Sequence, residues 1–159
     1  MIIGFSWRTI FTIGGNILLS FSVPTPEITY GEFPFWLEYT IDGKTIIVED
    51  VFIAEFQGFN WNLGLGGHRV WSGWIESSGE EMVFILEDGS KRIYATVGGA
   101  RYYMGDWHQT DEPFTPRIIV VISDDRGGTL TSGREELFEE YDIELISWEL
   151  SPPIVNSFR

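Results

Sequence analysis

The alternation of apolar and polar residues over residues 30–58 predicts the central element of the fold, a long β-hairpin. Asp42 and Gly43 lie at its middle, and an Asp-Gly pair readily adopts the positive φ angles that a two-residue hairpin turn needs. This turn would set Leu37 opposite Val48 on the apolar face. The second face carries both apolar and charged residues, so we expect one side of the hairpin to be buried and the other to be partly solvated.

Beyond the first six pairs, the same register would place Phe35 opposite Asp50, although the next apolar residue is Val51. The pattern therefore predicts a one-residue bulge near residues 49–50. The glycine- and aromatic-rich residues 59–67 are predicted as a loop after the hairpin. Residues 69–75 are then predicted as a short strand.

A second hairpin is predicted over residues 81–97, folded at Asp88-Gly89. Residues 82–86 are apolar at every position, which is typical of a strand that is buried on both faces. We therefore expect this hairpin to lie centrally in a sheet or between two layers. The turn at Asp88-Gly89 would pair Phe84 with Ile93, and Met82 with Ala95.

The C-terminal half continues the β pattern and adds one helix. The β-branched run at residues 118–122 predicts a buried strand, and residues 100–104 and 143–150 predict two more strands. Ser132 and Glu135 have the spacing of a capping box and predict the start of a short helix. Its apolar stripe would consist of Leu137, Phe138 and Tyr141.

These elements predict a mainly β fold, a single antiparallel β-sandwich or one strongly curved sheet with a short amphipathic helix near the C-terminus. Residues 27–159 would form this domain, after an N-terminal segment of residues 1–26. Apolar residues 9–23 follow Arg8 and precede two prolines, which is the order of a secretory or anchoring segment. The alternative is a pair of edge strands joined at Gly14-Gly15.

The charge of the chain excludes some partners. The 159 residues carry a formal net charge of −14, and the basic residues are scattered singly apart from Lys91-Arg92. Nucleic acids and anionic membrane surfaces need clustered Lys and Arg, so neither is an expected partner. The chain has no cysteine, which excludes thiol catalysis, disulfides and zinc-thiolate sites. A metal cation, a neutral sugar-like ligand or another small molecule, or a protein remains compatible.

The strongest candidate for metal binding is the polar loop at residues 105–116. Carboxylates in such a loop could offer oxygen ligands to Ca²⁺, and an imidazole with a carboxylate could bind a transition metal. No fixed ligand spacing is matched, and a solvated acidic loop explains the same residues. A second acidic turn at residues 124–128 lacks the order of an EF-hand loop and is interpreted as a simple turn. The candidate ligands are Asp106, His108, Asp111 and Glu112.

An exposed aromatic platform is the candidate site for a glycan. Flat apolar rings beside acidic groups stack on sugar rings, and a neutral sugar is not repelled by a negative surface. The alternative is that these rings belong to the core or cover the sheet. The candidate residues are Trp61, Trp71, Trp74, Trp107, Tyr102 and Tyr103.

No motif identifies a catalytic residue. The chain has neither a G-x-S-x-G elbow nor an H-E-x-x-H helix, and His68 and His108 have no matched partner pattern. The sequence therefore favours a non-enzymatic binding or interaction domain. The alternatives are a hydrolase that uses a pair of carboxylates not identified by sequence, and a structural subunit of a surface assembly.

Four segments together resemble a family of uncharacterised bacterial proteins, many of which are lipoproteins or membrane-anchored proteins outside the cytoplasm. The segments are residues 30–35 (YGEFPF), 102–106 (YYMGD), 146–149 (ISWE) and 151–154 (SPPI). The resemblance implies an extracytoplasmic or membrane-associated location and no catalytic residues. Lipoproteins of the family carry a lipid on a cysteine after the apolar segment, and residues 18–22 of this chain contain none.

Overall fold

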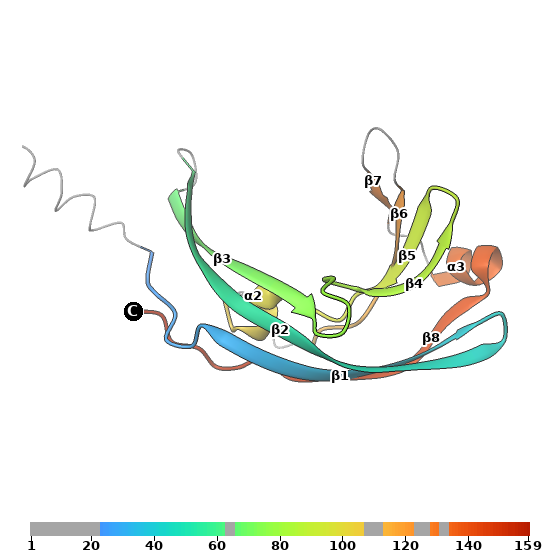
Figure 1. Ribbon diagram of the computed structural model, residues 1–159, viewed down its shortest axis with the longest axis horizontal. Helices are drawn as coiled ribbons and strands as arrows, with labels where there is room; N and C mark the ends of the chain where they lie inside the picture. Colours follow the sequence, from blue (N-terminus) through green and yellow to red (C-terminus); the bar gives the residue numbers. More distant parts are fainter. Residues whose placement is uncertain (1–22, 63–65, 107–112, 123–127, 131–133) are drawn as a thin grey trace, which may run out of the picture.

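The computed structural model describes residues 23–62, 66–106, 113–122, 128–130 and 134–159, which form two four-stranded antiparallel sheets (Figure 1). The first sheet is long and curled, with the strand order β3-β2-β1-β8, and the second is smaller, with the order β4-β5-β6-β7. The predicted mainly β fold with a strongly curved sheet is confirmed. The elements are β1 (Tyr30–Ile41), β2 (Lys44–Asn62), β3 (Gly66–Ile75), β4 (Val83–Asp88), β5 (Lys91–Ala95), α2 (Ala100–Tyr103), β6 (Ile118–Ile122), β7 (Gly128–Leu130), α3 (Arg134–Tyr141) and β8 (Ile143–Leu150).

The hairpin of β1 and β2 has the predicted turn and register. Asp42 and Gly43 have φ angles of 49° and 69°, so both residues adopt the left-handed conformation of a twist-matched two-residue turn. Leu37 pairs with Val48 as predicted. Local turn chemistry and side-chain alternation are therefore sufficient to fix this hairpin.

The bulge predicted at residues 49–50 is wrong, because Phe35 pairs directly with Asp50 and the ladder continues unbroken. The Asp50 carboxylate stays on the apolar face because it is satisfied there. It accepts a hydrogen bond from the backbone N–H of Val51 at 2.8 Å and another from the hydroxyl of Ser77. Because these hydrogen bonds satisfy the carboxylate, the strand needs no bulge to move Asp50 off this face.

A bulge does occur further along β2, between Phe56 and Gly58, in the ladder with β3. Gly58 has a φ of 105°, a conformation that glycine adopts without strain, and the strand continues past it to Asn62. The predicted loop at residues 59–67 is therefore wrong at its start. The extra residue turns Phe59 to the same face as Phe56, and their ring centroids lie 5.3 Å apart.

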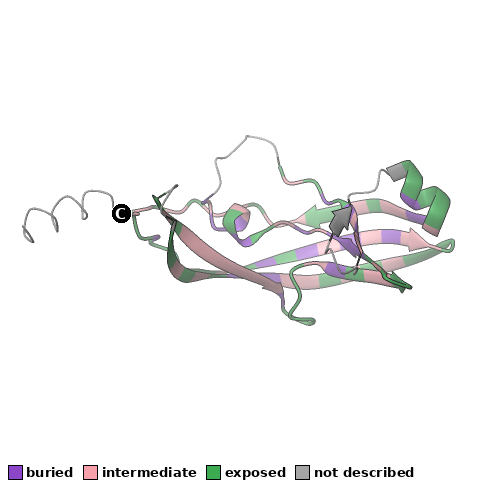
Figure 2. Cartoon of the chain, turned by 90° about the horizontal axis from the view of Figure 1, so that it is seen from above, coloured by how far each residue is buried: buried purple, intermediate pink, exposed green. Residues whose placement is uncertain are grey.

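The main core lies on the concave face of the curled sheet, beneath α2. Tyr103 of α2 is completely buried, and its ring stacks on Phe33 at 4.5 Å and lies 5.3 Å from Phe52. The strand predicted for residues 100–104 is wrong, because a helical turn forms there instead. The turn buries the consecutive residues Tyr103 and Met104 together, whereas a strand would point them to opposite faces. Figure 2 shows buried residues along the strands, and exposed ones at the turns and over much of α3.

The second hairpin differs from its prediction in register and in place. Gly89 and Ser90 form its two-residue turn, with Gly89 first at a φ of 60°. Because the turn is shifted by one residue and a bulge lies between Phe84 and Leu86, the predicted pairs Phe84 with Ile93 and Met82 with Ala95 do not form. β4 is an edge strand and Phe84 is 48% exposed, so the predicted burial of this strand on both faces is wrong as well, whereas its partner β5 lies inside the sheet. The observed pairs are Leu86 with Ile93, Phe84 with Tyr94 and Val83 with Ala95.

The last three predicted elements are present. β6 and β8 have the predicted bounds, and α3 begins two residues after Ser132, which itself lies outside the described residues. Leu137 is buried, whereas Phe138 is 52% exposed, so the apolar stripe of α3 is only partly covered. A second core cluster joins α3 to both sheets through Ile93, Ile118, Val120, Leu137 and Ile143.

The two ends of the described chain lie together. Thr25 and Arg159 exchange two backbone hydrogen bonds of 2.6 and 2.9 Å, and Pro26 forms a β-bridge with Phe158. Both predictions for the N-terminal segment fall on residues 1–22, outside the described residues. Among the helices of the described chain, none has the length and apolar composition to cross a membrane.

Candidate functional site

A groove of about 1240 Å³ opens between the concave face of the curled sheet and the start of the second sheet. Phe52, Trp71 and Gly73 contribute the sheet side of its lining. The remaining lining comes from the turn of α2 and from several connecting segments. These are Glu81, Met82, Thr96, Gly98, Gly99, Pro113, Phe114, Thr115, Arg117, Ile119 and residues 150–153. Side chains from segments far apart in the sequence therefore share one concave surface.

The part of the lining at residues 113–117 is held in place by two groups of contacts. The backbone N–H of Phe114 donates a hydrogen bond to the hydroxyl of Tyr102 at 3.2 Å, and the two ring centroids lie 5.7 Å apart. Thr96 fixes the next segment, because its hydroxyl accepts from the N–H of Arg117 at 3.0 Å and its own N–H donates to the Arg117 carbonyl at 2.8 Å. These contacts connect the lining to α2 and to the end of β5.

The lining of the groove is mainly apolar and carries a small excess of positive charge. The charged side chains that the described residues contribute to it are Glu81, Arg101 and Arg117. The rest of the chain is strongly acidic, so a lining with two cations and one anion contrasts with the surface around it. Apolar walls with a few polar groups are typical of small-molecule sites.

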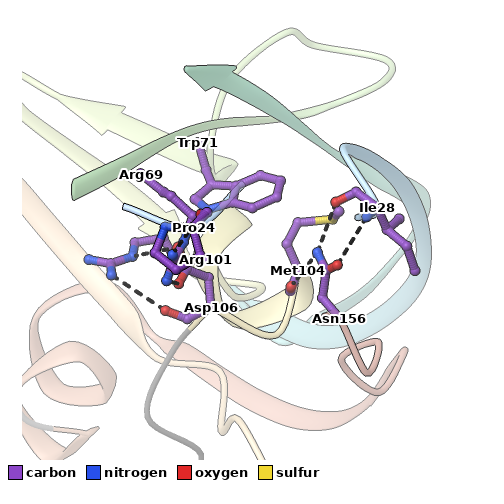
Figure 3. A network of polar contacts seen from close by, with 8 residues as sticks. All are labelled: Pro24, Ile28, Arg69, Trp71, Arg101, Met104, Asp106 and Asn156. Carbon is purple, nitrogen blue, oxygen red and sulfur yellow. Dashed lines mark hydrogen bonds and ion pairs between the residues drawn. The ribbon is translucent and has the colours of Figure 1, made fainter. Parts of the chain in front are cut away.

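Next to the groove, the buried carboxylate of Asp106 joins α2 to β3 (Figure 3). Asp106, whose side chain is 3% exposed, accepts hydrogen bonds from Nη2 of Arg69 at 2.5 Å and from Nε1 of Trp71 at 2.7 Å. Nε of Arg101 lies 3.9 Å from its second oxygen. Burial raises the pKa of Asp106, but the hydrogen bonds from Arg69 and Trp71 and the two guanidinium charges outweigh this effect and lower the pKa below its ordinary value.

Arg69 extends this cluster to both ends of the described chain. Its Nη1 donates to the carbonyl of Pro24 at 3.1 Å, and its guanidinium carbon lies 4.1 Å from the ring centroid of Phe158. Asp106 therefore fixes the guanidinium of Arg69, and Arg69 contacts both chain ends next to β3. We interpret this cluster as structural, because every polar contact in it connects parts of the chain.

Of the four predicted metal ligands, the structure describes Asp106 alone. Both of its carboxylate oxygens face cationic or N–H donors, and a cation would have to compete with the guanidinium groups of Arg69 and Arg101. His108, Asp111 and Glu112 lie outside the described residues, as does much of the acidic turn at 124–128. No cluster of three His, Asp or Glu side chains suited to a metal ion occurs in the described part of the chain. The Ca²⁺ site remains a prediction.

The six predicted platform residues do not share one surface. Trp71 and Tyr102 line the groove, whereas Tyr103 is a fully buried core residue. Trp74 lies on the opposite face of β3, since its neighbours Gly73 and Ile75 face the core and the groove. Trp61 is 58% exposed near the end of β2, and Trp107 lies outside the described residues.

Sequence reasoning missed most of the groove. Phe114 lies in the loop at residues 105–116 that is predicted as polar, and Arg117 directly precedes the strand predicted at residues 118–122. Two prolines, Pro113 and Pro116, bracket this segment and hold it extended, which was a usable signal for a rigid wall. Nothing in the sequence indicates that the segment lies across from Phe52 and Trp71.

Comparisons with protein-family models, with curated protein sequences and with solved structures find no match to this chain. The resemblance to bacterial lipoprotein-like proteins therefore stays a prediction.

Proposed function

We propose that this protein is a non-enzymatic, extracytoplasmic binding domain that takes its ligand in the groove. The observation that carries the proposal is a cavity of about 1240 Å³ lined mainly by apolar and aromatic residues from both sheets. Known ligand pockets of about 300–1,000 Å³ have the same composition, apolar walls with a few polar groups that orient the ligand. The groove is large enough for such a ligand.

The acid–base chemistry of the site favours binding over hydrolysis. A carboxylate-dependent hydrolase needs an acid with a raised pKa close to a second acid. The pKa of Asp106, the buried acid beside the groove, is lowered, and among the described residues Glu81 is the one carboxylate in the groove lining. Asp106 therefore does not fit the general acid that the hydrolase alternative requires, and the described lining offers no pair of carboxylates.

A neutral fluorescent probe, N-phenyl-1-naphthylamine, tests the proposed function. We expect saturable binding of one probe per chain, weakened about tenfold or more in Phe114→Asp, because a charge in the apolar wall opposes burial of the probe. Phe138→Asp is the matched control, since Phe138 is an exposed phenylalanine of α3 outside the groove. Equal binding to both variants, or no saturable binding to the wild type, contradicts the proposal.

We also propose that the protein attaches to membranes at the end of the curled sheet where the N-terminal segment joins. Val23 and the ring of Trp61 lie together over Gly67, where an added Cβ would be 2.7 Å from Val23 and 2.9 Å from Trp61. Trp61 and Phe59 are exposed there, and the apolar residues 9–23 lead to the same place. Exposed tryptophan beside an apolar segment is typical of a membrane interface.

Tryptophan quenching by brominated phosphatidylcholine vesicles tests this attachment in the full chain. A zwitterionic lipid is chosen because the formal net charge of −14 opposes binding to anionic lipid. We expect Trp61→Phe to reduce the quenched share of the emission. Trp148→Phe should leave it unchanged, because Trp148 is an exposed tryptophan on β8 at the opposite edge of the sheet. Equal quenching in both variants contradicts the proposed attachment.

A further inference from the structure

We infer that the groove selects a small amphipathic carboxylate, a molecule with an apolar body and one negative head group. This inference rests on the proposed binding function and adds the chemical class of the ligand. It departs from the neutral glycan and the cation considered from the sequence, because the charges of the groove lining favour a negative group.

The apolar body of such a ligand matches the walls of the groove. Trp71 and Phe52 lie on the sheet side, and Tyr102 and Phe114 lie on the side formed by α2 and residues 113–117. Phe114 and Tyr102 are half-buried, so each ring keeps part of its surface for a ligand. Burial of apolar surface against these rings supplies affinity without requiring hydrogen bonds.

The head group has a cationic partner in Arg117. Its backbone is fixed by the hydrogen bonds with Thr96, while its side chain forms no hydrogen bond or ion pair within the described residues. A guanidinium binds a carboxylate through two parallel N–H donors, which is a strong and directional contact. Arg101 adds positive charge to the same lining, although its guanidinium is also engaged by Asp106.

The surrounding charges strengthen the selectivity for an anion at this place. The nearby carboxylate of Asp106 is paired with Arg69 and hydrogen-bonded to Trp71, so its charge is compensated. Within the part of the chain that the structure describes, the lining contains one acid, Glu81, and two arginines. A cationic head group would therefore find less favourable partners in the groove than a carboxylate does.

Competition against N-phenyl-1-naphthylamine at neutral pH tests the inference, with ligands that share a twelve-carbon chain and differ in head group. We expect dodecanoate to displace the probe at about a tenfold lower concentration than dodecanol, the effect of one charge-assisted hydrogen-bonded pair. Dodecyltrimethylammonium should be the weakest competitor. Each ligand is used below its micelle concentration.

Arg117→Gln should abolish the preference for dodecanoate over dodecanol, and Arg117→Lys should keep part of it, since the charge remains without the planar fork. Arg92→Gln is the control, because Arg92 is an exposed arginine of β5 outside the groove. Denaturant midpoints equal to the wild type confirm that the variants fold, as expected for the exposed Arg117.

The outcomes separate the two proposals. If dodecanoate and dodecanol compete equally, or if Arg117→Gln keeps the preference, the groove binds apolar ligands and the head-group inference is wrong. If dodecyl maltoside competes better than dodecanoate, the ligand is a glycan and the inference is again wrong. If probe binding is insensitive to Phe114→Asp and no competitor displaces the probe, the proposed function itself fails.

Discussion

Asp106→Ala should lower the free energy of unfolding by about 3 kcal/mol, because it leaves a mostly buried guanidinium and an indole N–H without their acceptor. The Asp106 side chain is 3% exposed and that of Arg69 is 18% exposed, so water replaces little of what the carboxylate provides. Urea unfolding followed by tryptophan fluorescence measures the change. The loss should extend to the chain ends, since Arg69 also contacts Pro24 and Phe158.

Asp106→Asn is the control that keeps the shape of the side chain and removes its charge. The pKa of Asp106 is lower in the folded protein than in the unfolded chain, so its charge stabilises the fold at neutral pH. This stabilisation is lost as the pH falls below about 4 and through the lowered pKa. The difference in stability between the wild type and Asp106→Asn should therefore shrink on acidification. A difference that is constant from neutral to acidic pH contradicts this account of Asp106.

Tyr103→Ala should have the largest effect of any single substitution in the main core, about 3–5 kcal/mol. Tyr103 is completely buried, stacks on Phe33 and lies beside Phe52, so its removal leaves a cavity between α2 and the curled sheet. A shift in the urea midpoint at an unchanged slope would show that stability, and not the extent of unfolding, has changed.

Two matched variants separate packing from hydrogen bonding at this position. Tyr103→Phe keeps the ring and removes the hydrogen bond from the hydroxyl to the Val97 carbonyl, so it should cost about 1 kcal/mol. Tyr102→Ala removes a half-buried neighbour of the same type and should cost less than Tyr103→Ala. If Tyr102→Ala is the more destabilising of the two, the core is not organised around Tyr103.

The predictions that succeeded depend on neighbours in sequence. The two turn residues Asp42 and Gly43 fix the register of β1 and β2. The β-branched run of β6 is sufficient to predict a buried strand. The acidic helix α3 and the closing strand β8 are likewise encoded by their own periodicity. Each of these signals lies within a dozen residues.

The predictions that failed depend on partners elsewhere in the fold. Asp50 of β2 keeps its place opposite Phe35 of β1 because the hydroxyl of Ser77, from the turn after β3, donates a hydrogen bond to its carboxylate. The turn of α2 is too short to show a helical period, and its packing against the concave face of the curled sheet decides its conformation. The candidate site depends most strongly on residues that are far apart in the sequence. Asp106 meets Arg69 and Trp71 across 37 and 35 positions, and the groove lining comes from several separate segments.

The bulge at residue 57 divides β2 into two halves that differ in which residue numbers face the inner side of the sheet. Up to Phe56 the inward positions carry even numbers, and beyond Gly58 they carry odd numbers, with Phe59 and Trp61 on the inner side. Deleting a single codon at position 57 would remove the extra residue and let Gly58 follow Phe56 in a regular ladder, with Phe59 and Trp61 still on the inner side. If the present sequence formed the strand without a bulge, the inward positions would stay even-numbered and Asn60 would take the place of an aromatic ring, so the aromatic end of this sheet depends on the bulge as much as on its residues.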